Sequence, residues 1–215
     1  MPAPAELRTY RRNDCAVFRK TDERFGGLSN MAPGYPLCVN GVFIGTSEAM
    51  YQACRFPHLP DVQRLIISQT SPMTAKMRSK PYREQSRPDW DAVRVAAMRW
   101  SLRVKLVQNW EKFMSMLLMT EERPIVEDSR RDDFWGAVAT KEDSGILTGC
   151  NVLGRLLMEL REKIRHVSPE EWLGVRPPSI PDFLLYKQPI GLVLKAEAPE
   201  QHTRRPRFLG VEATH

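Results

Sequence analysis

The sequence predicts an α+β fold, a single predominantly helical domain with a small β-sheet and a proline-rich C-terminal extension. Apolar residues recur at helical spacing in several segments between residues 47 and 166. The pair Asn40-Gly41 joins two short apolar runs, a pattern typical of a β-hairpin. Seven of the 17 prolines follow Val167, which argues against a regular helical layer in that part of the chain.

Length and composition favour one domain with attached ends. The 215 residues, of which 42% are hydrophobic, suffice for one well-buried core and are too few for two large domains. We expect a loose N-terminal arm over residues 1–17, the main domain over residues 18–166 and the extension over residues 167–215. The extension is expected to drape over the domain and to be disordered near its end.

The first elements after the arm are a hairpin and a group of short helices. The hairpin is expected over residues 37–44. Short helices are expected over residues 48–56 and 61–69, and a third from residue 71 onward. Thr46 or Ser47 is the predicted N-cap of the first helix, with Glu48 in the first turn, where the helix dipole favours an acid.

The clearest periodicity follows Pro88. Apolar residues then recur at alternating spacings of 3 and 4, at Trp90, Val93, Ala97, Trp100, Val104 and Val107. This pattern predicts a core-facing helix of about five turns, with Asp89 as its cap. A further helix is expected over residues 111–119, a short strand at 125–126, a flexible loop at 145–149 and a last helix over 151–164, capped by Asn151.

The formal net charge of +6 is concentrated in one stretch of the chain. Residues 76–105 hold nine Lys and Arg residues against three Asp and Glu residues. Such a positive field attracts phosphate-bearing ligands, from mononucleotides to nucleic acid. The alternative interpretation is a solvated basic helix face.

Composition also argues against several classes of protein. No apolar run approaches the roughly 20 residues of a membrane-spanning helix. Residues 1–10 lack the apolar segment of a secretory signal, so we expect a cytoplasmic protein. The four cysteines are widely spaced without a CxxC pair, which predicts reduced thiols and neither a zinc site nor a disulfide framework.

Several polar motifs interrupt the apolar segments in a recognisable order. They are Phe25–Asn30, Thr46–Phe56, Ser71–Met73, Arg87–Trp90, Val126–Glu127, Asp132–Gly136, Gly149–Gly154 and Leu157–Arg161. In residue types and order these motifs resemble the NADAR (YbiA-like) family, over residues 18–166. The extension lies outside the resemblance.

The resemblance implies a hydrolase that cleaves the C1–N bond between ribose and a nitrogenous leaving group, without a metal or cofactor. Two substrate classes are implied. One is ADP-ribosylated guanine in nucleic acid, where the protein acts as an antitoxin; the other is the phosphorylated ribosylamino-pyrimidine intermediates of riboflavin synthesis. The basic stretch favours the first. A non-catalytic reader of ADP-ribose or nucleic acid is the alternative from another class.

Breaking a C1–N bond passes through a cationic sugar, so a carboxylate is needed nearby and the departing base needs an acid or cation. Glu48 is the first candidate, and its alternative is a glutamate that only complements the helix dipole. Asp132 matches the family's aspartate and is the second catalytic candidate, with a turn-forming aspartate as its alternative.

The resemblance also implies substrate-binding residues. They are Asn30, Gln52, Arg55, Trp90, Lys105, Glu127, Trp135, Gly136 and Asn151. Trp135 is the better stacking candidate, since Trp90 also belongs to a core stripe, and Glu127 has an ion pair with a nearby arginine as its alternative. The glycine-flanked helix start at Asn151 offers N–H groups to a phosphate. Arg55 stands where the family usually has lysine, and the loop over residues 137–148 is longer than in the family.

Overall fold

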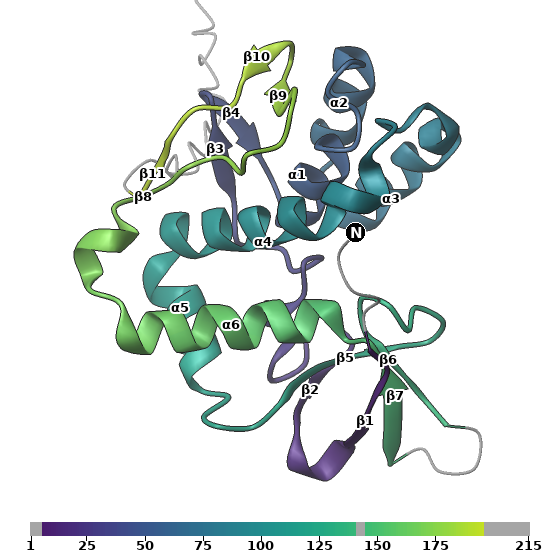
Figure 1. Cartoon of the computed structure of the whole chain (residues 1–215), viewed down its shortest axis with the longest axis vertical. Coiled ribbons are helices and arrows are strands. Elements are labelled where there is room, and N and C mark those ends of the chain that lie inside the picture. The colour runs from purple at the N-terminus through teal and green to yellow at the C-terminus, as the bar shows by residue number, and fades with distance from the viewer. Residues whose placement is uncertain (1–5, 141–144, 196–215) are drawn as a thin grey trace, which may run out of the picture.

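The computed structural model describes residues 6–140 and 145–195. Helices and sheets are mixed, and Figure 1 shows α4 (Trp90–Gln108) and α6 (Val152–His166) crossing the middle of the molecule. A five-stranded sheet lies below them in this view, and the strands of the extension lie above. Within the described residues, no helix is long and apolar enough to cross a membrane.

The main sheet has the strand order β1-β7-β6-β5-β2. Its strands are β1 (Arg8–Arg11), β2 (Ala16–Phe18), β5 (Ile125–Ser129), β6 (Ala137–Ala139) and β7 (Ile146–Gly149). β5 pairs in parallel with both β2 and β6, whereas β7 pairs antiparallel with β6 and β1. Helix α6 packs on β5, so this strand joins the sheet to the helical core.

Two expectations fail in this sheet. Residues 8–11 and 16–17 of the predicted loose arm form strands, and the predicted flexible loop at 145–149 contains β7. Residues 8–11 are mostly polar, and the other two strands are only three and four residues long, so none of these segments carries a clear apolar alternation. Their order comes from partners distant in sequence: Tyr10 and Cys15 bury against Val126 and Leu147 in a small cluster of their own.

The predicted hairpin is confirmed as β3 (Leu37–Val39) and β4 (Val42–Ile44). Asn40 and Gly41 at its tip have φ values of 50° and 75°, the positive values that a type I′ turn requires. The hairpin packs against α4 through β3 and against the following helix through β4.

The three short helices predicted after the hairpin are confirmed and pack on one another. They are α1 (Ser47–Ala53), α2 (Pro60–Ile67) and α3 (Pro72–Ser79). Thr46 is the N-cap of α1, since its hydroxyl accepts the N–H of Ala49, and Ser71 caps α3 in the same way. Every residue of α1 is buried, so its polar side chains face the interior.

The long helix α4 and its neighbour α5 (Trp110–Leu118) match the predicted periodicity. Asp89 and Asn151 hold the predicted N-cap positions of α4 and α6, but neither side chain makes a capping hydrogen bond. The Asp89 carboxylate accepts hydrogen bonds from Arg87 instead. Asn151, before α6, adopts a left-handed conformation with φ 47° and makes no side-chain cap. Its side chain donates to the carbonyl of Ile125 and accepts the N–H of Glu127, tying α6 to β5.

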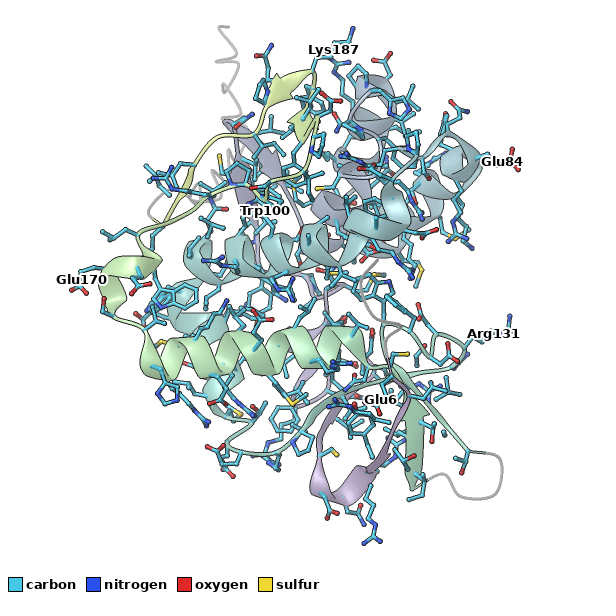
Figure 2. The ribbon with its side chains drawn as sticks, in the orientation of Figure 1. Glu6, Glu84, Trp100, Arg131, Glu170 and Lys187 are labelled. Carbon is cyan, nitrogen blue, oxygen red and sulfur yellow. The ribbon has the colours of Figure 1, made fainter. Side chains whose placement is uncertain are left out.

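The extension is part of the core as far as residue 195. It holds a 3-10 turn (Pro169–Trp172) and two small ladders, β8 (Gly174–Val175) with β11 (Val193–Leu194) and β9 (Leu184–Leu185) with β10 (Gln188–Pro189). Trp100, labelled in Figure 2, packs edge-on against Phe183 with ring centroids 5.0 Å apart. The predicted disorder near the chain end falls on residues 196–215, outside the described residues.

Candidate active site

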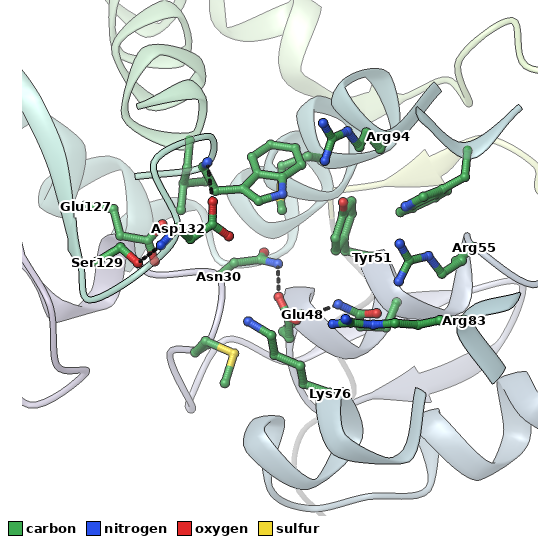
Figure 3. A pocket seen from close by; sticks show the side chains of 16 residues that line it. Asn30, Glu48, Tyr51, Arg55, Lys76, Arg83, Arg94, Glu127, Ser129 and Asp132 are labelled. Atoms are coloured by element: carbon green, nitrogen blue, oxygen red, sulfur yellow. Dashed lines mark hydrogen bonds between the residues drawn. The ribbon is translucent and has the colours of Figure 1, made fainter. Parts of the chain in front are cut away.

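A cavity of about 340 Å³ opens where α1, α3 and α4 face β5 and the loop that follows it. Figure 3 shows the side chains that project into it. Its lining residues are Asn30, Met31, Glu48, Tyr51, Gln52, Arg55, Lys76, Arg83, Trp90, Arg94, Met98, Glu127, Ser129, Asp132, Trp135 and Leu153. The volume suits a ligand the size of a nucleotide.

Glu48 is fixed at the floor of this cavity by side chains on both sides. It is 5% exposed, its Oε2 accepts from Asn30 Nδ2 over 2.7 Å, and its Oε1 accepts from Gln52 Nε2 over 2.8 Å. Gln52 is in turn oriented by Ser79, whose hydroxyl donates to its Oε1 over 3.0 Å. The carboxylate therefore points from the first turn of α1 into the cavity rather than into solvent.

Asp132 holds the loop that carries Trp135. Its Oδ1 accepts the backbone N–H groups of Phe134, over 3.1 Å, and Trp135, over 2.9 Å. The turn-forming role is thus real, and the carboxylate lines the cavity at the same time. The catalytic role of Asp132 stays a prediction, which its place in the cavity lining permits.

Glu127 comes from β5 and lines the cavity beside Asp132. Its pKa is raised from 4.5 to about 7, first by burial and then by the negative charges of Asp132 and Glu48, with Lys76 opposing. No ion pair joins Glu127 to an arginine among the described residues, so the predicted alternative for this residue is wrong.

An aromatic wall closes one side of the cavity. Tyr51 packs between the two indoles, with ring centroids 5.2 Å from Trp90 and 5.6 Å from Trp135. Trp90 is buried in the core, as its place in the apolar stripe predicts, and also lines the cavity; its stacking on a base stays a prediction. Burial raises the pKa of Tyr51, which keeps its hydroxyl neutral.

Four cations line the cavity, and three of them have no carboxylate within ion-pair distance in the described part of the chain. Those three are Arg55, Lys76 and Arg83, whereas Arg94 lies 3.6 Å from Asp91. Arg55 stacks over Trp90 at 5.0 Å, and Arg94 lies over Phe134 at 3.8 Å. Three of the four cations are therefore not held in a direct ion pair by a described carboxylate.

Three predicted substrate-binding residues lie outside the cavity lining: Lys105, Gly136 and Asn151. Lys105 is fully buried, and its Nζ donates to the carbonyls of Gly27 and Ser29 over 2.7 and 2.9 Å. Burial lowers its pKa well below the usual value. The prediction of direct substrate contact for Lys105 is wrong, because a lysine on a core-facing helix stripe cannot be distinguished by spacing from one that reaches a pocket.

The expected phosphate site at the start of α6 is also wrong. The N–H groups of Asn151, Val152 and Leu153 donate to the carbonyls of Gly136, Phe134 and Trp135. A side chain at Gly136 would collide with the carbonyl of Glu127, at 2.5 Å from a built Cβ. Asn151 and Gly136 thus position the loop and β5, and the N–H groups of residues 151–153 are already engaged by this loop rather than open to an anion.

Several cavity residues escaped sequence reasoning. Tyr51, Lys76, Arg83 and Arg94 line the site without having been singled out. A signal for Arg94 was present, since it lies four residues after Trp90 and so shares a face of α4. Lys76 and Arg83 lay inside the basic stretch, but nothing in their spacing distinguished them from Arg78 and Lys80, which do not line the cavity.

Comparison with known proteins agrees with this architecture. The sequence model of the NADAR domain family matches residues 17–165. The N-glycosidase YbiA of Escherichia coli (strain K12) is 33% identical over 168 residues, which cover 76% of this chain and 98% of YbiA. A riboflavin biosynthesis protein of Vibrio vulnificus is 32% identical over 152 residues, 71% of this chain and 39% of that protein. The NMR structure of E. coli YbiA superposes with a TM-score of 0.58 at 31% identity, covering 71% and 86% of the two chains.

The family match, the named relatives and the fold are those of N-glycosidases, hydrolases that act on N-glycosyl bonds. The chain belongs to the NADAR family.

Proposed function

We propose that this protein hydrolyses the C1–N bond that joins ADP-ribose to guanine in nucleic acid, and so reverses ADP-ribosylation in an antitoxin-type role. The observation that carries the proposal is the position of Glu48. Its carboxylate is held by two amides inside a cavity that two indoles and four cations also line.

Glu48 suits the demands of C1–N cleavage. As the bond breaks, positive charge develops on the ribose ring, and a fixed carboxylate stabilises that charge without having to reorient. The same carboxylate can activate the water that attacks C1. Because Asn30 and Gln52 hold both oxygens, the carboxylate is aimed before the substrate arrives.

The cations favour a substrate with more than one phosphate. Arg55, Lys76 and Arg83 have no carboxylate partner among the described residues, and Arg94 adds a fourth positive charge. A diphosphate can engage several of them, and arginine binds phosphate oxygens in a bidentate manner. Trp90 and Trp135 supply flat faces for a base. The basic residues outside the cavity would contact the phosphate backbone of a nucleic-acid partner.

A riboflavin-pathway substrate is the second candidate, because a relative that matches 71% of this chain is named a riboflavin biosynthesis protein. A phosphorylated ribosylamino-pyrimidine has the same C1–N bond and would use Glu48 in the same way. Its single phosphate leaves most of the four cations without a ligand. That imbalance is why we favour the ADP-ribosyl substrate.

The test incubates the purified protein with an oligonucleotide carrying ADP-ribosylated guanine and, separately, with the pyrimidine ribosylamine phosphate. Mass spectrometry detects free ADP-ribose or ribose phosphate, and Glu48→Gln is the control. Release of ADP-ribose by the wild type alone supports the proposal. Release only from the pyrimidine compound selects the second candidate, and binding of the oligonucleotide without release of a base identifies a reader and overturns the hydrolase.

A further inference from the structure

We propose that Glu127 is the general acid of this site, the group that gives its proton to the departing nitrogen. The inference rests on the proposed N-glycosidase activity and assigns a role that the binding prediction for Glu127 did not contain. It follows from a comparison of the three carboxyl groups that line the cavity, Glu48, Asp132 and Glu127.

The three carboxyl groups differ in the donors they accept. Glu48 accepts two side-chain amides, and Asp132 accepts two backbone N–H groups. Protonating either of them would put these hydrogen bonds at risk. The Glu127 side chain accepts no hydrogen bond from any residue that the structure describes. Of the three groups, Glu127 is therefore the one whose protonation disturbs the fewest hydrogen bonds.

The surroundings of Glu127 favour its neutral form. Asp132 faces it from the loop after β5 and Glu48 faces it from α1, so two negative charges oppose ionisation, and Lys76 from α3 partly offsets them. Burial acts in the same direction. Together these influences raise the pKa of Glu127 to about 7, near the pH at which an acid catalyst works best.

The backbone of Glu127 is held in place on rigid structure. It pairs with Phe18 of β2, and its N–H donates to Asn151 Oδ1 over 3.2 Å. Gly136 lies against its carbonyl so closely that no other residue fits there. Figure 3 shows the side chain on the same side of the cavity as Asp132, with Glu48 across from it and Asn30 between Asp132 and Glu48. An acid on this side and a carboxylate on the other can act on opposite ends of one bond.

Proton transfer from Glu127 accompanies cleavage of the C1–N bond. The C1–N bond breaks, its electron pair goes to the nitrogen, and the Glu127 carboxylic acid gives that nitrogen a proton. Glu48 stabilises the cationic sugar until water adds to C1. Glu48 takes up the proton that this water loses and releases it to solvent, and the Glu127 carboxylate takes up a proton from solvent, so the enzyme is restored. The products are a free sugar hydroxyl and an N–H base.

The kinetic test measures single-turnover rates between pH 5 and pH 9 on the oligonucleotide carrying ADP-ribosylated guanine. Wild type, Glu127→Gln and Asp132→Asn are compared. We expect the wild-type rate to fall as pH rises through about 7, because Glu127 loses its proton there. In Glu127→Gln the rate at pH 6 should drop on the order of 10²-fold or more, and the fall above pH 7 should vanish. In Asp132→Asn a fall should remain but begin at lower pH, because one of the negative charges that raise the Glu127 pKa is gone.

A second readout needs no turnover. Carbon-13 NMR of protein labelled at glutamate should show a carboxyl signal that titrates near pH 7 and is missing in Glu127→Gln. A signal that titrates at the ordinary carboxyl value overturns the inference. So does a fall above pH 7 that persists in Glu127→Gln, or a loss confined to KM.

Failure of the proposed substrate can be told apart from failure of this inference. If the wild type releases no ADP-ribose while the NMR signal titrates near pH 7, the substrate assignment is wrong, and the same kinetic comparison is run on the pyrimidine ribosylamine phosphate. A wild type active on that compound and a Glu127→Gln variant with an unchanged pH profile would again reject Glu127 as the acid.

Discussion

Glu48 and Gln52 lie one turn apart on α1, and the Gln52 amide donates to the Glu48 carboxylate over 2.8 Å. Because Gln52 accepts from Ser79 on α3, the orientation of the carboxylate depends on two helices. The spacing of four residues that marks one helix face in the sequence is here the means by which the carboxylate is aimed.

Glu48→Gln should abolish turnover and leave the fold intact. The replacement keeps size and burial but removes the negative charge that stabilises the sugar cation, so we expect kcat to fall about 10³-fold or more. Rates with saturating substrate measure the loss, and thermal unfolding checks the fold. Activity equal to the wild type would show that the reaction does not use this carboxylate.

Asp132 can be tested by two substitutions that separate its roles. Asp132→Asn keeps the oxygen that accepts the N–H groups of Phe134 and Trp135, whereas Asp132→Ala removes it. We expect a loss of less than about tenfold in kcat for the first, and for the second a larger loss with a raised KM as the Trp135 loop loses its anchor. Equal, severe losses in both variants would instead assign the charge of Asp132 to the chemistry.

The free energy of unfolding should depend on pH because Glu127 holds its proton more tightly in the folded protein than in the unfolded chain. The unfolded chain loses this proton near pH 4.5 and the folded protein near pH 7, so stability falls as pH rises between these values. Glu127→Gln has no such proton to lose. Its stability relative to wild type should therefore rise between pH 4.5 and pH 7, by on the order of 2 kcal/mol. Urea unfolding at pH 4, 6 and 8 measures this difference in unfolding free energy. If Glu127 had an ordinary carboxyl pKa in the folded protein, the difference would not change with pH.

Lys105 should affect stability and not substrate affinity. Lys105→Met leaves the buried carbonyls of Gly27 and Ser29 without their donor, which we expect to cost about 1–3 kcal/mol. The KM of the folded fraction should not change. Arg94→Gln is the matched control, since it removes a cation that lines the cavity and should raise KM with little change in stability. A raised KM in Lys105→Met would instead show that Lys105 does affect substrate binding.

Phe183 tests whether the extension belongs to the core. Its ring packs edge-on against Trp100 and is 8% exposed, so Phe183→Ala should destabilise the protein by about 3–5 kcal/mol. Chemical denaturation measures the change. Phe43→Ala is the control, because that ring is 49% exposed. A loss no larger than that of the control would show that residues beyond 166 only rest on the domain.

Sequence reasoning succeeded where the signal is local. The Asn40-Gly41 turn, the cap at Thr46, the helix start at Ser71 and the apolar stripe of α4 each depend on neighbours within a few residues, and the structure confirms them. Asn30, Gln52, Arg55, Trp90 and Trp135 were brought together by family resemblance, and the cavity does contain them. Whether they bind substrate stays a prediction.

What the sequence could not reveal depends on contacts between distant segments. Strand β1 is ordered by β7, more than 130 residues away, and nothing in the polar residues 8–11 indicates it. Lys105 and Arg94 both lie on α4 in the basic stretch, yet one is enclosed by aromatic rings and the other reaches the cavity. Only the packing around the helix decides between them.

Helix α4 bears Trp90 and Arg94 at one end and, farther along, Trp100 beneath Phe183. A chain shortened to the matched residues 17–165 would lose Phe183, which packs on Trp100, and would also lose the edge strand β1. A shortened version of this enzyme should therefore keep β1 and the extension through β11, about thirty residues past the family boundary.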